Sequence, residues 1–370
     1  METPTMENSQ VTLVVVPRER FSHTREALES IYEHTDYPFQ LVYIDGGSPS
    51  HIQSYLEAQA QQKQFQLIRT EYYLTPNRAR NLGLQQVKSK YVIFIDNDVV
   101  VTPGWLKRLV QSADETGAAA VGPLICIGKP EHEIIHNAGQ EAHIVTKVKD
   151  GQTVRRAHQK TYLAHRRVSD VRDQLHLLQC ESIEFHCMLV RTEIFEQIGF
   201  LDEKLLSTRE HVDFCMTVAQ LGGDIYCERR SLVTYVAQGL SEWSDIGFFM
   251  LRWSDAWNMA SLDHFRQKWD LTEDKYFKKR YGELTHRRHR VFIQPLIKNL
   301  CPNEFNPELA AKIVAMEKEL NRYISDDYTQ KQLKLGQTQS SGRPEDDSTQ
   351  KQFLFEQRTP SSEHLQPVAL

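Results

Sequence analysis

The hydrophobic and polar positions up to residue 124 alternate between two patterns. Short apolar runs are typical of buried strands, and the stretches between them repeat apolar residues at helical spacing. The apolar runs are 11–16, 39–45, 65–70, 91–96 and 118–124, and the helical stretches are 24–34, 49–63, 76–88 and 103–116. This alternation predicts an α/β fold with a doubly wound, mostly parallel sheet. In such a sheet, ligands bind beyond the carboxyl ends of the strands.

The pattern is less regular beyond residue 124. A polar stretch rich in His, Lys and Arg is followed by strand-like and helical segments. The residues after Ser241 are aromatic and helical, whereas those after Ser325 are rich in Gln, Ser and Thr and too poor in large apolar residues to offset the entropy of ordering. We therefore predict an α/β domain over 11–237, a helical C-terminal extension over 238–324 and a disordered tail over 325–370.

Composition and charge narrow the class of protein. The 44 Lys and Arg residues nearly balance 49 Asp and Glu residues, and the formal charge of −5 argues against a nucleic-acid-binding protein. No apolar run reaches the ~18 residues that span a bilayer, and the polar start lacks the features of a signal peptide. The six scattered cysteines are typical of reduced thiols. We expect a cytoplasmic protein. Its basic run 278–290 either forms a solvated helix or contacts anionic lipid or a charged glycan at the inner face of the membrane.

Carboxylates follow two of the predicted strands. Asp96-Asn97-Asp98 follows a strongly apolar run, and Asp45 ends another run in front of two glycines. Carboxylates at a strand end can hold Mg²⁺ together with the phosphate oxygens of a ligand, and the metal then stabilises a departing phosphate. Asp45 could accept a hydrogen bond from a base or ribose. The alternative is that both segments are polar turns that cap the following helices.

Arginines open the helix that follows the third strand. The segment TPNRARNLG contains Arg78, Arg80 and Asn81. Arg80 could pair with Asp96 or with a phosphate, because the guanidinium geometry suits both. A solvated helical face is the alternative.

Taken together, these motifs resemble the glycosyltransferase family 2 enzymes, which have the GT-A fold. The resemblance runs through VTLVVVPRER (11–20), IDGGSPS (44–50), NRARNLG (77–83), YVIFIDNDVVVTPGWLKRLV (91–110), CMLVRTEIFEQIGFLDE (187–203) and REHVDFCMTVAQLGG (209–223). It implies an enzyme that moves a sugar from a nucleotide-diphosphate donor, most simply a UDP-sugar, to a hydroxyl of a glycan, lipid-linked or small-molecule acceptor. It also implies inversion at the anomeric carbon and use of Mn²⁺ or Mg²⁺.

The resemblance assigns roles to particular residues. Asp45 resembles the acid that contacts uracil, and Pro17 and Arg80 belong to segments that would bind the donor. The motif Asp96-Asn97-Asp98 resembles the acidic motif that meets the sugar and the metal-bound diphosphate. Asp96 and Asp98 are the candidate metal ligands, with Asp98 the more direct one. These donor-binding residues should face the segment around Glu210 across a cleft wide enough for a nucleotide and a hexose.

The sequence departs from the family pattern at two positions. Where the family has Glu-Asp, this chain has Glu210-His211, followed by Asp213. Any of the three could be the base that takes the proton from the acceptor hydroxyl, and the ordinary pKa of an imidazole, near ~6.5, suits His211 to that role. Ser207 and Glu210 also fit a capping box. Tyr235 replaces a metal-binding histidine of many relatives, so a catalytically degenerate relative that only binds a nucleotide sugar or glycan stays an alternative.

A different enzyme class is suggested by His132-Glu133-Ile134-Ile135-His136, which matches the HExxH motif of zinc hydrolases. That motif requires a helix, whereas Pro130, the adjacent isoleucines and Asn137-Ala138-Gly139 favour strand and turn. We therefore expect a His-rich loop over the acceptor cleft. His186 is either close to the acceptor or a buried structural histidine. The remaining aromatic candidates, which could stack on sugar rings or form core, are Trp243, Trp253, Trp257 and Trp269.

Overall fold

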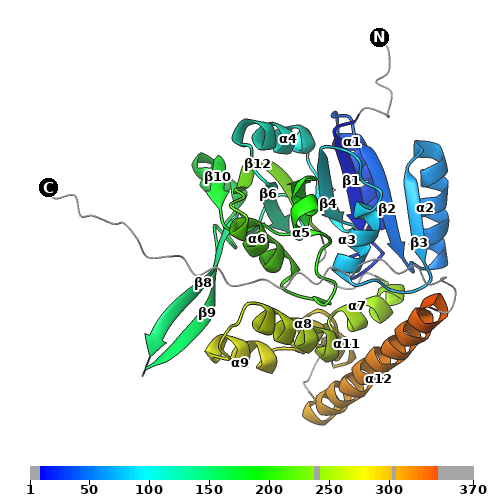
Figure 1. Cartoon of the computed structure of the whole chain (residues 1–370). Helices are drawn as coiled ribbons and strands as arrows, with labels where there is room; N and C mark the ends of the chain where they lie inside the picture. The colour runs from blue at the N-terminus through cyan, green and yellow to red at the C-terminus, as the bar shows by residue number, and fades with distance from the viewer. Residues whose placement is uncertain (1–8, 150, 237–241, 302–305, 341–370) are drawn as a thin grey trace. The chain divides into compact units, whose positions relative to one another are not determined.

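The computed structural model describes residues 9–149, 151–236, 242–301 and 306–340 (Figure 1). The chain divides into a unit of residues 1–327 and a unit of residues 328–370. In the second unit, the described residues are the end of helix α12 (Pro307–Ser340). The predicted disordered tail therefore begins too early, because the chain is helical up to Ser340. The residues from 325 onward include Lys, Gln and Leu, which are good helix formers. The predicted tail beyond Ser340 lies outside the described residues.

A ten-stranded sheet forms the centre of the first unit, with the strand order β10-β12-β6-β11-β4-β1-β2-β3, while β5 pairs with β12 and β7 with β6. Strand β1 runs parallel to its neighbours β2 and β4, and the pairs β2–β3 and β6–β12 are also parallel. Strand β11 is antiparallel to both β4 and β6. The strands are β1 (Val11–Val16), β2 (Gln40–Gly46), β3 (Gln66–Thr70), β4 (Tyr91–Asp96), β5 (Val99–Val101), β6 (Ala120–Ile127), β7 (Ile135–Asn137), β10 (Leu177–Cys180), β11 (Cys187–Arg191) and β12 (Ile225–Tyr235).

Helices cover both faces of this sheet (Figure 1). The helices of the domain are α1 (Thr24–His34), α2 (Ser50–Lys63), α3 (Pro76–Leu84), α4 (Trp105–Thr116), α5 (Ile194–Ile198) and α6 (Glu210–Gln220). Side chains alternate between the faces along each strand, so Leu13 packs in one core with α1, α2 and α4, whereas Val14 packs in another with α3, α5 and α6. The predicted α/β fold with a mostly parallel sheet is confirmed.

Two further parts of the chain lie outside the sheet and its helices: a hairpin and a group of C-terminal helices. A long hairpin of β8 (Gln140–Lys149) and β9 (Gln152–Thr161) arises from the polar stretch, followed by a 3₁₀ segment at Val168–Gln174. The C-terminal helices are α7 (Ile246–Arg252), α8 (Asp255–Lys268), α9 (Lys275–Gly282), α10 (His286–Arg288), a π-helical turn (His289–Ile293), α11 (Gln294–Leu300) and α12. Helix α8 packs its Leu262 and Phe265 against α6 and the hairpin. These helices begin within the range 238–324 that the sequence predicts as a helical extension, and α12 continues beyond it to Ser340.

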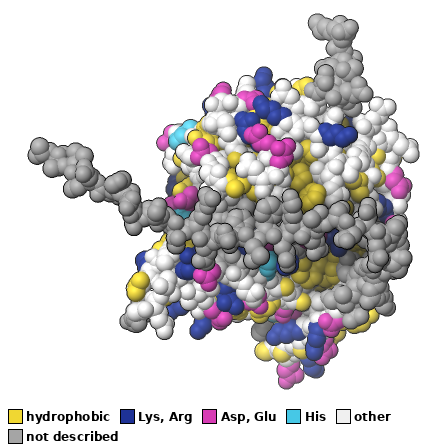
Figure 2. Space-filling model, viewed as in Figure 1, with side chains coloured by type: hydrophobic (Ala, Val, Ile, Leu, Met, Phe, Trp, Pro, Cys, Tyr) yellow, Lys and Arg dark blue, Asp and Glu magenta, His cyan; other side chains and the backbone are white. Residues whose placement is uncertain are grey.

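The aromatic and basic candidates of this extension separate by burial. Trp257 and Trp269 are core residues, whereas Trp243 is 79% exposed. Arg288 in the basic run is fully buried and pairs with Glu317, so this part of the run is not a solvated helix face. On the face drawn in Figure 2, basic and acidic side chains are interspersed. Among the described helices, none combines the length and apolar character needed to cross a bilayer.

Candidate active site

The carboxyl ends of neighbouring strands place the predicted acidic residues at one edge of the sheet. Strand β1 lies between β2 and β4 and runs parallel to both. Asp45 belongs to the end of β2, and Asp96 ends β4. The carbonyl oxygen of Asp98 accepts a hydrogen bond of 3.0 Å from the backbone N–H of Val236, just after β12. Asp45, Asp96 and Asp98 therefore share the edge where parallel α/β sheets bind ligands.

Basic side chains surround Asp96. Its Oδ2 lies 3.1 Å from both Arg18 Nη1 and His186 Nδ1, and its Oδ1 accepts a hydrogen bond of 3.4 Å from Arg80 Nη2. Burial acts to raise the pKa of Asp96, but the hydrogen bond from His186 and the charges of Arg18 and Arg80 outweigh it and lower the pKa to about 2. Asp96 is thus an ionised carboxylate whose oxygens are already engaged by the protein.

Asp98 lies in the opposite kind of environment. Its side chain is 0% exposed, and its closest ionic partner, Arg20 Nε, is 4.0 Å from Oδ2. Neither carboxylate oxygen has a hydrogen-bond partner among the described residues. Burial, followed by the charge of Asp96, raises the pKa of Asp98 well above the ordinary value of an aspartate. A buried carboxylate with two unused oxygens fits Mn²⁺ or Mg²⁺, which bind hard oxygen ligands.

Asn97 fastens the turn between these two acids to the loop after β1. Its Oδ1 accepts a hydrogen bond of 3.1 Å from Arg18 N, and its Nδ2 donates one of 2.8 Å to Arg20 O. Pro17 opens the same loop and lies against Gly46, where an added Cβ would come within 3.0 Å of Pro17 Cγ. The absence of a side chain at Gly46 therefore lets the end of β2 approach this loop.

Asp45 caps the turn that leads into α2. Ser48 donates to it from its backbone N–H at 2.9 Å and from its hydroxyl at 2.8 Å. Arg69, the residue in register with Asp45 on β3, forms an ion pair with the same carboxylate. Asp45 is 1% exposed. The turn-capping role that the sequence leaves open as an alternative is thus present. The guanidinium of Arg69 lies beside it and could also contact a ligand.

Arg80 is buried rather than part of a solvated helix face. It is 2% exposed, and its guanidinium stacks 4.2 Å from the centre of the Phe185 ring while bonding to Asp96. Burial lowers the pKa of Arg80 despite this acidic partner. Arg80 therefore holds Asp96 from the side of α3.

The candidate bases in α6 differ in how the protein engages them. Asp213 accepts hydrogen bonds of 2.7 Å from Lys268 Nζ and 2.8 Å from Trp269 Nε1, which tie α6 to the C-terminal helices. Glu210 is 7% exposed and accepts a hydrogen bond of 3.0 Å from Arg252 Nη2. Both carboxylates are therefore engaged in structural pairs.

His211 is the least engaged of the three. Within the part of the chain that the structure describes, its ring makes no hydrogen bond. Burial lowers its pKa, although the charges of Glu184 and Glu210 act in the opposite direction. The predicted capping box is not formed. Helix α6 begins at Glu210 itself, and its N-cap residue is Arg209, whose side chain makes no capping hydrogen bond.

Arginines connect the segment of Asp96 to the segment of Glu210. Arg252 is 2% exposed and donates its Nε–H to Arg18 O at 3.2 Å while it pairs with Glu210. The side chain of Arg18, 18% exposed, covers Asp96. Carboxylates gathered at buried strand ends require counter-charges and donors, which these arginines supply. Arg18 and Arg252 thus connect the two acidic segments, and the cleft for the donor stays a prediction.

The zinc-hydrolase interpretation of the HExxH match is wrong. His132 has a positive φ of 62°, and its backbone N–H donates to Thr234 Oγ1 at 2.8 Å. Glu133 pairs with Arg167 at 3.0 Å, and His136 lies in strand β7. Since a zinc helix would place both histidines on one face, one turn apart, this backbone cannot bring them to a common ion.

Sequence analysis missed Glu19, which connects the site to the C-terminal helices. Glu19 is 0% exposed and accepts hydrogen bonds of 2.6 Å from both Tyr235 Oη and Trp253 Nε1. Arg287 adds a bond of 2.8 Å. The only local signal is an acid between two arginines directly after a buried strand. The hydroxyl of Tyr235, the residue in place of the family histidine, is thus engaged by Glu19.

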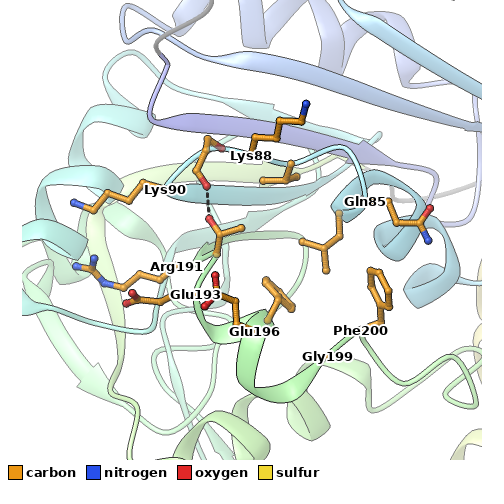
Figure 3. Close-up of a pocket in the computed structure, with 13 residues that line it drawn as sticks. Gln85, Lys88, Lys90, Arg191, Glu193, Glu196, Gly199 and Phe200 are labelled. Atoms are coloured by element: carbon orange, nitrogen blue, oxygen red, sulfur yellow. Dashed lines mark hydrogen bonds between the residues drawn. The ribbon is translucent and has the colours of Figure 1, made fainter. Parts of the chain in front are cut away.

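A surface pocket lies at the other end of β4 (Figure 3). Lys90 and Arg191 flank the start of β4 and the end of β11, and Glu193, Glu196 and Phe200 complete the rim drawn there. Because Asp96 ends β4, this pocket is a strand's length away from the acidic edge. It does not belong to the candidate active site.

The structure is an α/β fold with acidic residues at the carboxyl ends of its strands, and comparison with known proteins gives the family. Residues 12–199 match the family model for glycosyl transferase family 2, which is just over half of the chain. The chain belongs to this family. The sequence resemblance to family 2 is thereby confirmed.

Several curated bacterial proteins are similar to the chain at low identity. Succinoglycan biosynthesis protein ExoW of Rhizobium meliloti is 25% identical over 56% of this chain and 63% of its own length. O-antigen biosynthesis protein RfbC of Myxococcus xanthus is 22% identical over 60% of this chain and 17% of its own. An uncharacterised protein, y4gI of Sinorhizobium fredii, is 22% identical over 59% and 23%. The chain thus matches less than two thirds of the length of each of these relatives.

Among solved structures, the chain is similar to the crystal structure of GalNAc-T7 with UDP, GalNAc and Mn²⁺. The TM-score is 0.48 and the sequence identity 16%, over 75% of this chain and 58% of the other.

Proposed function

We propose that the chain transfers a sugar from a nucleotide-diphosphate donor, first of all a UDP-sugar, to an acceptor hydroxyl with inversion and with the help of Mn²⁺ or Mg²⁺. Two relatives are named for succinoglycan and O-antigen biosynthesis. A growing glycan, free or lipid-linked, is therefore the acceptor class to test first, ahead of other small molecules. A lipid-linked acceptor would bring the protein to the membrane surface.

The observation that carries the proposal is the pair of unused, buried oxygens of Asp98 beside the fully engaged Asp96. Asp98 would hold the divalent cation, and Asp96 would keep Arg18 and Arg80 in place next to it. When bound, the cation would stabilise the negative charge that leaves with the nucleoside diphosphate. Asn97 would hold the turn so that both acids keep their positions.

A bound donor would share the arginine that covers Asp96. Arg18 is the partly exposed side chain over Asp96, and a guanidinium can exchange a carboxylate for a diphosphate oxygen without losing its hydrogen bonds. Asp45, next to Arg69 and near Pro17, would accept a hydrogen bond from the uracil of the donor. These residues would then orient the donor with its diphosphate toward Asp98.

His211 is the base that the contacts favour. Glu210 is held by Arg252, and Asp213 by Lys268 and Trp269. The neutral imidazole of His211 can accept the proton of the acceptor hydroxyl as the new glycosidic bond forms. Glu210 and Asp213 would then position the start of α6 and tie it to the C-terminal helices.

Release of nucleoside diphosphate from a panel of UDP- and GDP-sugars, with glycan acceptors and Mn²⁺, tests the proposal. We expect release that EDTA abolishes and that the Asp98→Asn variant lacks. Asp114→Asn, at the opposite end of β4 beside Lys90, is the matched control. Donor-dependent thermal stabilisation without any release would instead support the degenerate, binding-only relative.

A further inference from the structure

Three potential metal ligands converge next to Asp96. His136 comes from β7, and Glu184 and His186 come from the segment before β11. Glu184 Oε2 lies 3.1 Å from His136 Nε2 and 3.5 Å from His186 Nε2. One ligand atom of each residue lies within 4.8 Å of the others. Two imidazoles and one carboxylate are a ligand set for Zn²⁺ and related divalent ions, and three protein ligands leave a further coordination position open.

His186 is oriented as a metal ligand would be. It is 2% exposed, and its Nδ1 lies 3.1 Å from Asp96 Oδ2 and 3.2 Å from Arg18 Nη1. The ionised carboxylate is the stronger acceptor, so it takes the protons of both neighbours. Metal-bound histidines almost always donate their other ring N–H to a carboxylate or carbonyl in this way.

The same arrangement leaves an electrostatic conflict that a cation would resolve. With its proton on Nδ1, His186 directs the lone pair of Nε2 at Glu184 Oε2, so two acceptors face each other. Asn137 Nδ2 donates to the other oxygen, Oε1, at 3.2 Å, and thereby turns Oε2 toward the histidines. His136 Nε2 can donate a proton to Glu184 Oε2, whereas the facing Nε2 of His186 cannot, and an ion between the three atoms would be ligated by all of them.

The site is accessible and separate from Asp98. The side chain of His136 is 33% exposed, which gives an ion a route to Glu184, and the His136 and His186 rings meet edge to face at 5.6 Å. Asp98 does not belong to this group of ligands. We propose that His136, Glu184 and His186 bind one divalent transition-metal ion of the Zn²⁺ class, distinct from the cation of the sugar donor. This ion links β7 to the start of β11 and holds His186 against Asp96.

Titration of the tag-free, EDTA-treated full chain with Co²⁺, followed by visible absorption, tests the site. Zn²⁺ content after reloading and dialysis gives an independent measurement. We expect stoichiometric binding that becomes at least ~10- to 100-fold weaker in His136→Ala and Glu184→Gln, because even loss of an outer-sphere partner has an effect of this size. Asp98→Asn should keep the Co²⁺ spectrum.

His143→Ala is the matched control. His143 pairs with Glu181 at 2.7 Å in an exposed His–Glu pair that lies outside the three-ligand group, so its loss should leave Co²⁺ affinity unchanged. If His136→Ala fails to fold by circular dichroism, the isosteric Glu184→Gln variant carries the test.

Two results would overturn the proposal. One is a wild-type chain that binds no stoichiometric Co²⁺ or Zn²⁺. The other is binding that survives in Glu184→Gln but disappears in Asp98→Asn, which would assign the ion to the donor edge. Neither result bears on nucleoside diphosphate release, so the proposed transfer activity is tested independently.

Discussion

The two halves of the sheet use their buried charges differently. In the half formed by β1 to β4, carboxylates at strand ends face arginines, as in the pairs of Asp45 with Arg69 and Asp96 with Arg18. In the half that contains β7 and β11, histidines surround a glutamate. A guanidinium keeps its charge at every working pH, whereas an imidazole can gain a proton or a metal ion. The arginine pairs of the first half thus keep their charge, apart from Asp98 with its raised pKa, whereas the histidines of the second half are adjustable.

The largest effect should come from Asp98, the one strand-end acid in the first half whose oxygens no arginine hydrogen-bonds. We expect Asp98→Asn to lower kcat by about 10³-fold or more, since a catalytic metal supplies several kcal/mol and each 1.36 kcal/mol is tenfold. Initial rates of nucleoside diphosphate release at saturating Mn²⁺ measure it. The variant should fold normally, because the amide removes a buried, poorly paired charge. Wild-type rates in Asp98→Asn would disprove the metal role.

His211 should give the next largest effect. The charge of Glu184 acts on its imidazole, so His211 tests the half of the sheet in which histidines surround that glutamate. We expect His211→Ala to lower kcat by ~10²-fold or more, the usual range for a lost general base. His211→Asp, which restores the family residue, should keep substantial activity.

The pH profile distinguishes a base at position 211 from a structural role. A base works only when deprotonated, so kcat/KM should fall as the pH drops through the pKa of His211, which burial places below its ordinary value. In His211→Asp this fall should move to still lower pH, provided that both enzymes are measured at saturating Mn²⁺, which keeps Asp98 ionised. Asp213→Asn is the control. This change loosens the contact with Lys268 and should lower thermal stability, but it should not change the pH at which kcat/KM falls. An identical acid limb in His211→Asp would exclude His211 as the base.

The two halves also differ in how far sequence predicts them. Asp45 and Asp96 end apolar runs of parallel strands, and the rule that such ends share an edge suffices to bring them together. His136 and Glu184 are 48 residues apart in sequence and meet only because β7 and β11 both pair with β6. The literal HExxH match concealed this, because it joined His136 to a neighbour in sequence rather than in space. The connection from Asp96 to Glu210 through Arg18 and Arg252 likewise depends on distant packing.

Asp45 should have a smaller effect, confined to donor affinity. We expect Asp45→Asn to weaken binding of UDP by about tenfold, since one hydrogen bond to a charged group contributes ~1.5–3 kcal/mol and part of this is retained by the amide. Isothermal titration calorimetry with UDP and Mn²⁺ measures it, and kcat at saturating donor should change little. Ser48→Ala, which removes a partner of Asp45 without removing the acid, is the control. An unchanged affinity in Asp45→Asn would leave Asp45 only its role in the turn.

The smallest effect should come from the pocket at the other end of β4, a strand's length away from the acidic edge. Phe200 is 57% exposed and Lys88 is exposed on the rim of that pocket. We expect Phe200→Ser and Lys88→Ala to change kcat/KM and stability by no more than about 0.5 kcal/mol, as surface substitutions usually do. Steady-state rates and thermal unfolding of both variants test this. A larger loss of rate at unchanged stability would mean that acceptor or regulator binding extends to the amino-terminal edge of the sheet. The residues needed for activity would then not be confined to the carboxyl ends of the strands in the two halves.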